Sequence, residues 1–194
     1  MLLYFSDTAH CNAWEQRKLG ELYDSASEGG TPDTNNPIYY KNKDIPFVKI
    51  EDTENKYITN VCTYISKEGL KHSSAWLIPE NSVIFTNGAT VGNVAINKLP
   101  VATKQGILGI IPNDKITTEF LYYLLTTPKF QHEVKRREAK GTFATIILRN
   151  LNEINVNVAK KLEQNKISDI LSNLDRLITL HQRKLKHRKK TNKC

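Results

Sequence analysis

Short runs of β-branched and aromatic residues fill the middle of the chain and predict strands. They cover residues 45–50, 83–86, 91–96 and 107–111, and clusters of Gly, Pro, Asn and Thr separate them. Asn87-Gly88 stands between two of these runs, and both residues tolerate a positive φ, which favours a hairpin there. The runs together indicate a twisted, mainly antiparallel sheet.

Helical spacing appears on either side of these strands. Over Trp14–Tyr23 the apolar residues recur at roughly helical intervals among charges, which predicts a short helix or an ordered lead-in. Residues 118–130 place Phe and Leu on one face, with a capping residue at Thr117 or Thr118. Helices that flank a sheet in this way predict an α+β fold.

The pattern changes after residue 158. Lys, Glu, Gln, Asn and Leu follow without Gly or Pro, which predicts a long exposed helix over residues 159–190 and a tail of residues 191–194. The preceding globular domain is expected to cover residues 14–158, after a lead-in of residues 1–13. This domain organisation makes the helix an appendage of the globular part.

The expected helix carries a seam at alternating steps of four and three residues. Its members are Ile167, Leu171, Leu174, Ile178, His181 and Leu185. A seam of two residues per heptad suits pairing with another long helix, and a polar residue within it can set the register. The chain is therefore expected to be one part of an assembly. Because fewer than three full heptads are present, a helix folded back on its own domain stays open as an alternative.

Composition favours a nucleic-acid partner. The chain has 194 residues and a formal charge of +8, with Lys and Arg gathered in residues 129–140 and 183–190. Each cluster is equally compatible with a solvated helix face. The three cysteines, Cys11, Cys62 and Cys194, have unrelated spacings, so no metal site and no cofactor are expected. With no signal-peptide pattern and no run of membrane-spanning length, the expected location is cytoplasmic, away from membranes.

Several loop residues have the chemistry that a reader of double-stranded DNA needs. Lysine neutralises phosphates, while amides and hydroxyls reach base edges, and glutamine in particular suits adenine. The candidate DNA-binding residues are Thr31, Asn87, Thr90, Lys104, Gln105, Lys140 and Thr142. For any one of them an ordinary turn or surface role is the more common explanation, and the group is the stronger argument.

Two other classes of function remain open from the residues alone. Asp33, Glu54 and Lys56 are the residue types of a magnesium-dependent nuclease, although they stand in polar loops where rigid strands are expected. No P-loop and no Gly-x-Ser-x-Gly motif occurs. A module that binds only other proteins is the third possibility.

The order of motifs along the chain resembles the specificity subunit of Type I restriction–modification systems. The segments that carry the resemblance are Trp14–Glu21, Gly29–Pro32, Ile45–Val48, Leu77–Val83, Gly88–Gly92, Pro100–Gly106, Phe120–Leu125, Gly141-Thr142 and Glu163–Leu185. The chain departs from the family at Phe47, where Trp is more usual, and at Lys104, where Asn is more usual. The basic run from Lys186 onwards replaces an expected amphipathic continuation.

The resemblance implies a half-length form with one target recognition domain and one spacer helix. Members of the family usually have two of each, and their helices pack antiparallel. The helix of this chain would thus pair with a second copy or with another specificity chain. The resemblance also implies no catalysis in this subunit, because methylation and cleavage belong to the modification and restriction subunits that it recruits.

Overall fold

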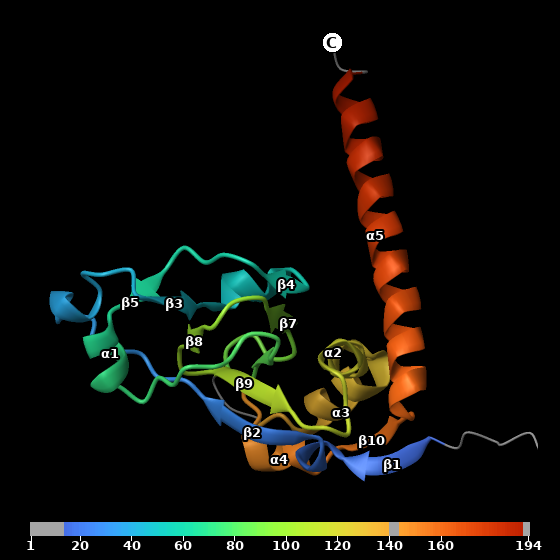
Figure 1. Cartoon of the computed structure of the whole chain (residues 1–194), viewed down its shortest axis with the longest axis horizontal. Helices are drawn as coiled ribbons and strands as arrows, with labels where there is room; N and C mark the ends of the chain where they lie inside the picture. Colours follow the sequence, from blue (N-terminus) through green and yellow to red (C-terminus); the bar gives the residue numbers. More distant parts are fainter. Residues whose placement is uncertain (1–13, 140–143, 192–194) are drawn as a thin grey trace, which may run out of the picture.

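The fold is α+β, as the sequence pattern predicts, with a long helix at its end. The structure is a computed structural model that describes residues 14–139 and 144–191, with side chains of the last helix described to residue 184. In the described residues the main sheet has the strand order β2-β9-β6-β7-β4. Figure 1 labels β2, β9, β7 and β4 of this sheet. Neighbouring strands are antiparallel except β4 and β7, which are parallel. The strands are β2 Tyr23–Glu28, β4 Tyr57–Ile58, β6 Val83–Thr86, β7 Val94–Asn97 and β9 Ile107–Pro112.

Two smaller sheets flank the main one. The first joins β5, β3 and β8, beside the short helix α1. The second pairs β1 with β10 directly before the long helix. These elements are β1 Glu15–Lys18, β3 Ile45–Val48, β5 Tyr64–Ile65, β8 Ala102–Thr103, β10 Asn155–Val158 and α1 Lys67–Lys71. Short 3₁₀ helices cover Leu19–Glu21, Pro37–Tyr39 and Ile50–Glu54.

Of the two alternatives predicted for Trp14–Tyr23, the short helix is wrong, and the segment is an ordered lead-in. The described part of this segment forms β1, a 3₁₀ turn and the start of β2. Strand β1 forms because it pairs with β10, from Glu15 opposite Val158 to Lys18 opposite Asn155. A partner so far along the chain leaves no mark on the local spacing of apolar residues, so helical periodicity alone misassigned the segment.

The expected hairpin between residues 83–86 and 91–96 forms, but its turn does not lie at Asn87-Gly88. Strands β6 and β7 pair as antiparallel neighbours, but residues with positive φ in their loop are Ala89 and Gly92. Asn87 and Gly88 instead donate backbone hydrogen bonds to the Gly106 carbonyl, at 3.0 and 3.2 Å. Because this pair is held against the neighbouring loop, the turn occurs further along the chain.

The helical segment 118–130 divides into two helices. Helix α2 covers Thr118–Thr126 and α3 covers Pro128–Arg137. The hydroxyl oxygen of Thr117 accepts from the Phe120 amide at 3.3 Å, which confirms Thr117 as the cap of α2. Thr127 caps α3 in the same way, with Pro128 at the first helical position, where a missing N–H costs nothing. A third short helix, α4, covers Leu148–Asn152.

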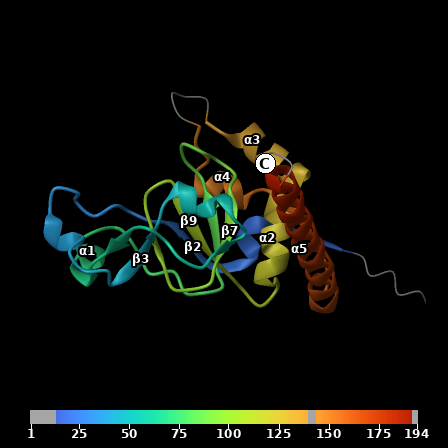
Figure 2. The same cartoon turned by 90° about the horizontal axis from the view of Figure 1, so that it is seen from above.

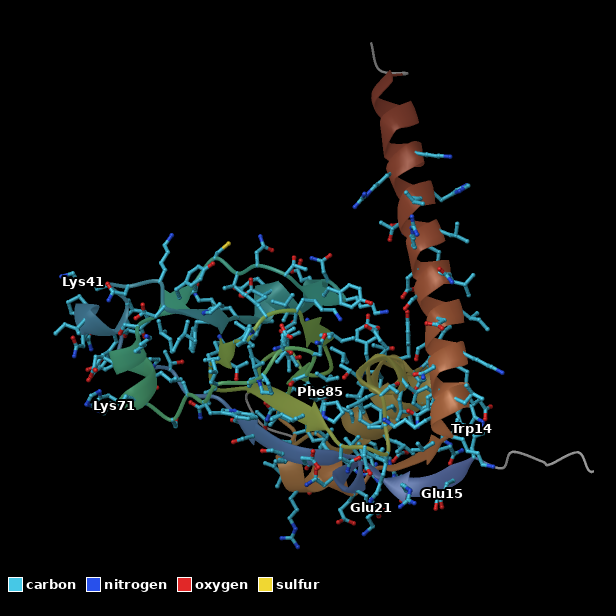
Figure 3. All side chains as sticks on the ribbon, in the orientation of Figure 1. Trp14, Glu15, Glu21, Lys41, Lys71 and Phe85 are labelled. Carbon is cyan, nitrogen blue, oxygen red and sulfur yellow. The ribbon has the colours of Figure 1, made fainter. Side chains whose placement is uncertain are left out.

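The largest hydrophobic core lies between the main sheet and these helices. Phe85 on β6 is fully buried and meets Phe130 of α3 edge to face, with ring centroids 6.4 Å apart (Figure 3). Leu108 and Ile110 of β9 join the same cluster, and Phe120 of α2 packs on it. Burial of such aromatic side chains contributes about 2–3 kcal/mol each, so this cluster fixes the helices to the sheet.

The long helix α5 covers Lys161–Thr191 and projects from the body. Figures 1 and 2 show it on the opposite side of the body from α1. Its first turns lie beside α2, and its base contacts Trp14, whose indole N–H donates to Glu163 at 2.9 Å (Figure 3). Neither α5 nor any other described helix is apolar enough over the thickness of a bilayer to cross a membrane.

Candidate nucleic-acid interface

One end of the main sheet carries a cleft of about 430 Å³. Its walls are the loop after β6, the loop between β8 and β9, and the segment before α4. The residues that line it, which we call the loop cleft, are Glu28, Ile50, Asn87, Gly88, Ala89, Lys104, Gln105, Gly106, Thr145, Ile146 and Ile147. Three loops that are far apart in the sequence thus present backbone and polar groups to one surface, the usual way in which a scaffold carries a binding site.

Asn87 organises the loop cleft from inside. Its side chain is buried, and its amide nitrogen donates to the Glu28 carboxylate and to the Ile146 carbonyl. The backbone N–H of Ile146 in turn donates to the Asn87 carbonyl at 2.9 Å. Asn87 therefore ties the loop after β6 to the segment before α4. This placement favours a structural role over the direct base contact predicted from sequence, which needs an accessible amide.

Glu28 is the residue of the cleft that sequence reasoning missed. The carboxylate receives the Asn87 amide and lies 3.5 Å from the Gly106 N–H. Glu28 reaches this position because β2 pairs with β9, with Glu28 opposite Leu108. Since that pairing joins distant strands, no local signal around Glu28 could have indicated the site.

The other predicted DNA-binding residues fall into three groups. Lys104 and Gln105 line the loop cleft, and Gln105 is exposed. Thr31 and Thr90 are exposed but do not line it. Lys140 and Thr142 lie outside the described residues. The consecutive residues Lys104 and Gln105, one suited to phosphate and one to a base edge, thus both line the loop cleft.

Helix α3 brings positive charge close to the loop cleft. Ala139, just after the helix, bridges to Thr145, which also bridges to Gly88. The last turn of α3 carries three consecutive basic residues, Lys135, Arg136 and Arg137. Glu133 pairs with both arginines, and their hydrogen bonds, that of Arg137 first, hold the pKa of its carboxyl below the usual range. The charge of Glu133 therefore offsets part of this positive cluster.

The residues of the alternative nuclease site do not form one. Asp33 accepts the backbone N–H of Asn35 in its own turn, at 2.9 Å. Lys56 is engaged by Glu119 and Tyr123 of α2, at 2.9 and 2.8 Å. Among the described residues, no three His, Cys, Asp or Glu side chains gather in a way that could hold a metal ion. The Lys56 ammonium therefore binds side chains of α2 and does not join Asp33 in a catalytic site.

Helix α5 has two faces of opposite character. Toward the body, Gln164 is fully buried: its carbonyl oxygen accepts the Thr117 N–H, and its amide nitrogen donates to the carbonyls of Lys115 and Ala159, all at 2.8 Å. Ser168, one turn further, is also buried. Hydrogen bonds of Gln164 thus attach the base of α5 to the body.

The outer face of α5 is apolar. Four side chains have exposed fractions of 48–61%, and we call them the outer stripe: Ile170, Leu174, Leu177 and Ile178. Ile178 also lines a cleft with Lys56 and Tyr57 of the body. Two members of the predicted seam, Leu174 and Ile178, belong to it, and His181 is exposed beyond it. Ile167 packs against the core and Leu171 is half-buried, while the side chain of Leu185 lies outside the described part. The seam and the outer stripe thus share Leu174 and Ile178.

The family model for the Type I restriction modification DNA specificity domain matches residues 12–188. The chain belongs to this family. As a specificity domain it is 32% identical, over 168 residues, to the Type I restriction enzyme MjaIX specificity subunit of Methanocaldococcus jannaschii. It is 36% identical, over 140 residues, to the Type I restriction enzyme HindI specificity subunit of Haemophilus influenzae. These alignments cover 85% and 72% of this specificity domain, but only 38% and 29% of the relatives.

Solved structures share the fold of this specificity domain. The HsdS subunit from Thermoanaerobacter tengcongensis superposes with a TM-score of 0.64 at 17% identity, over 88% of this chain and 39% of that one. The Type-I restriction-modification system S subunit from M. genitalium gives 0.63 at 16% identity, over 87% and 41%. The specificity domain thus spans about two fifths of each of these chains.

Proposed function

We propose that this chain is a half-length specificity subunit of a Type I restriction–modification complex, which reads one half of a bipartite target in double-stranded DNA. The observation that carries the proposal is that Lys104 and Gln105 share one cleft, beside basic α3, in a chain of this family. Lysine supplies a phosphate contact and glutamine a bidentate contact to adenine. The chain itself performs no chemistry in this scheme; it recruits the modification subunits that methylate and the restriction subunit that cleaves.

The outer stripe supports pairing through α5 with a second copy or a related chain. Exposed apolar residues at steps of four and three, such as Ile170, Leu174 and Leu177, are the pattern by which two long helices pack. Burial of this stripe against a second helix removes it from water, which favours association. A contact of this kind restores a reader with two recognition domains.

Charge favours an antiparallel arrangement of the two helices. The end of α5 carries six basic residues in a run: Arg183, Lys184, Lys186, Arg188, Lys189 and Lys190. Parallel pairing sets two such runs side by side, where like charges repel, whereas antiparallel pairing keeps them at opposite ends. The 31 residues of α5 span about 45 Å, which exceeds one DNA turn of roughly 34 Å. Two recognition domains at the ends of such a pair are far enough apart to read half-sites about one turn apart.

DNA binding tests the proposed role of the loop cleft. The chain, assembled with its modification subunit, is titrated into a mixed-sequence duplex longer than two helical turns, and fluorescence anisotropy is followed at several salt concentrations. Lys104→Ala should weaken binding and lower the slope of log affinity against log salt by about one, because one phosphate contact is lost. Lys71→Ala, which removes an exposed lysine on α1 at a distance from the cleft, is the matched control.

Other outcomes of this titration contradict the proposal. Failure to bind the duplex at any salt concentration favours a module that contacts only proteins. An unchanged slope in Lys104→Ala removes the loop cleft from the interface. Cleavage of the duplex by the chain alone with Mg²⁺, abolished by Asp33→Ala, favours the nuclease.

A further inference from the structure

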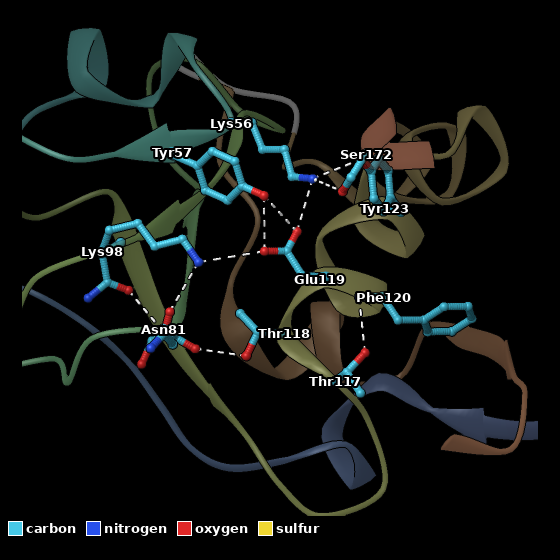
Figure 4. A network of polar contacts seen from close by, with 12 residues as sticks. Lys56, Tyr57, Asn81, Lys98, Thr117, Thr118, Glu119, Phe120, Tyr123 and Ser172 are labelled. Carbon is cyan, nitrogen blue, oxygen red and sulfur yellow. Dashed lines mark hydrogen bonds and ion pairs between the residues drawn. The ribbon is translucent and has the colours of Figure 1, made fainter. Parts of the chain in front are cut away.

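Lys56 lies at a junction of the sheet edge, α2 and α5. Its side chain is only 14% exposed. The ammonium nitrogen donates to the Tyr123 hydroxyl at 2.8 Å and to the Ser172 hydroxyl at 2.9 Å, and it lies 2.9 Å from a carboxylate oxygen of Glu119 (Figure 4). An ammonium has three N–H groups, so each of them has a partner here. The partners belong to two helices, and Lys56 belongs to neither.

Aromatic rings surround the same ammonium. The ring centroids of Tyr123, Tyr57 and Tyr122 lie 4.3, 4.9 and 5.2 Å from the nitrogen, within the range of cation–π attraction. Burial by itself lowers the pKa of Lys56, but hydrogen bonds to Tyr123 and Glu119 outweigh it, and the net pKa of the ammonium is raised. Lys56 therefore remains charged in the folded protein.

The same cluster attaches α5 at a second point along its axis. Besides Ser172, Asp175 of α5 accepts a hydrogen bond from the Tyr123 hydroxyl at 2.6 Å. The first attachment is Gln164 at the base of the helix. Eight residues separate Gln164 from Ser172, which is about 12 Å at a rise of about 1.5 Å per residue. A single attachment leaves a pivot, whereas a second one at this distance also fixes the direction of the axis.

We propose that Lys56 is a positioning residue that fixes the direction of α5 relative to the globular domain. Beyond Asp175, no described side chain of α5 hydrogen-bonds or forms an ion pair with the body. The helix continues for 19 residues after Ser172, a lever of about 28 Å. A tilt of about 10° at the junction displaces its end by about 5 Å.

The consequence for DNA reading rests on the proposed function. Successive base pairs are about 3.4 Å apart, so a displacement of about 5 Å exceeds one base-pair step. With α5 as the spacer between two recognition domains, the junction at Lys56 sets the number of base pairs between the half-sites. Ser172 and Tyr123 act with Lys56 in this role because they carry its contact to α5.

Spin-label distances within one chain test the junction directly. Labels are attached at Lys71→Cys on α1 and Arg183→Cys near the end of α5, in a chain whose three native cysteines are changed to serine. Dilution with excess unlabelled chain restricts the measured distances to single chains. Lys56→Met should broaden or shift the distance distribution by about 3 Å, because the ammonium that joins Ser172 to α2 is lost and only the Tyr123 hydroxyl then holds α5 at the junction; residue 183 lies 11 residues, about 16 Å, beyond Ser172. Lys56→Arg should restore most of the narrow distribution.

Lys98→Met is the matched control. The Lys98 ammonium lies 3.6 Å from the same Glu119 and 4.8 Å from the same Tyr57 ring, but it forms no hydrogen bond or ion pair with the described side chains of α5. Its loss should leave the distribution unchanged. A distribution in Lys56→Met equal to that of the unmodified chain, or equal broadening in Lys98→Met, overturns the proposal.

Two further measurements keep folding and function separate from this result. If Lys56→Met does not fold, Ser172→Ala removes one contact of the junction and should give a smaller broadening, whereas an unchanged distribution in that variant overturns the proposal. The distance readout needs neither DNA nor modification subunits. If Lys56→Met broadens the distribution while the unmodified chain directs no methylation, the junction is supported and the proposed function is refuted.

Discussion

The buried side chains of α5 differ in kind from those that it exposes. A helix that packs on its own domain normally turns its apolar side inward and its polar side to solvent. In α5 the buried side chains are Gln164 and Ser168, while Leu174 and Leu177 of the outer stripe are exposed. The comparison shows that hydrogen bonds of Gln164 hold the base of α5, and that apolar side chains of the outer stripe remain exposed.

The largest expected effect is the loss of self-association when the outer stripe is changed. Leu174→Asp places a charge in the apolar contact, and an uncompensated buried charge costs about 3–5 kcal/mol. Self-association should weaken at least about 100-fold, since every 1.4 kcal/mol is about tenfold. Light scattering over a range of concentrations should report a mass near that of one chain.

Leu162→Asp is the control for that variant. Leu162 is 70% exposed on α5 but does not belong to the outer stripe. Its substitution should leave the mass unchanged. Equal masses for Leu174→Asp and the unmodified chain exclude the outer stripe as the contact surface.

Removing the hydrogen bonds of Gln164 should lower the stability of the folded chain. Gln164→Ala leaves the Thr117 N–H and two carbonyls without their partner, and each unpaired buried group costs about 1–3 kcal/mol. A loss of about 3 kcal/mol lowers the unfolding midpoint by about 6–12 °C for a chain of this size. Calorimetry on Gln164→Ala should show this decrease with the mass of the assembly retained at high concentration.

Gln182→Ala tests whether the effect belongs to the buried position. Gln182 lies five turns along the same helix and is exposed. The unfolding midpoint of Gln182→Ala should equal that of the unmodified chain. If Gln164→Ala melts at the same temperature as Gln182→Ala, the hydrogen bonds of the inner face contribute nothing to the attachment of α5.

The smallest expected effect concerns pH. The pKa of Lys56 is raised in the folded protein, so its stabilisation is fully present below the ordinary lysine value of about 10.4 and is lost only as pH rises through the higher folded value. The difference in melting temperature between the unmodified chain and Lys56→Met should therefore stay constant from about pH 6 to pH 9. A difference that shrinks toward pH 9 contradicts the charged junction.

Local sequence patterns predicted the helices and strands that depend on neighbouring residues in the chain. The β-branched runs gave β6 and β9, the cap at Thr117 gave the start of α2, and the absence of Gly and Pro indicated α5. The strand β1 was missed because its partner β10 lies at the far end of the domain. Local spacing carries no record of a partner that folding brings together.

The candidate site was predictable only in part for the same reason. Lys104 and Gln105 were recognised as polar residues in a glycine-containing loop, and the structure places both in the loop cleft. Glu28 enters that cleft through the pairing of β2 with β9, and Lys56 meets Ser172 across the junction with α5. Of the predicted seam, Ile167 packs against the core and Leu171 is half-buried, because the first turns of α5 lie beside α2, which the helical repeat alone does not reveal.

Methylome sequencing tests the central claim most directly. Cells express this chain with its modification subunit and with no other specificity chain. Pairing of two identical chains relates their recognition domains by a twofold axis, so the account predicts adenine methylation at a symmetric motif of two half-sites separated by a fixed spacer. No methylated motif, or a single undivided one, would contradict the account.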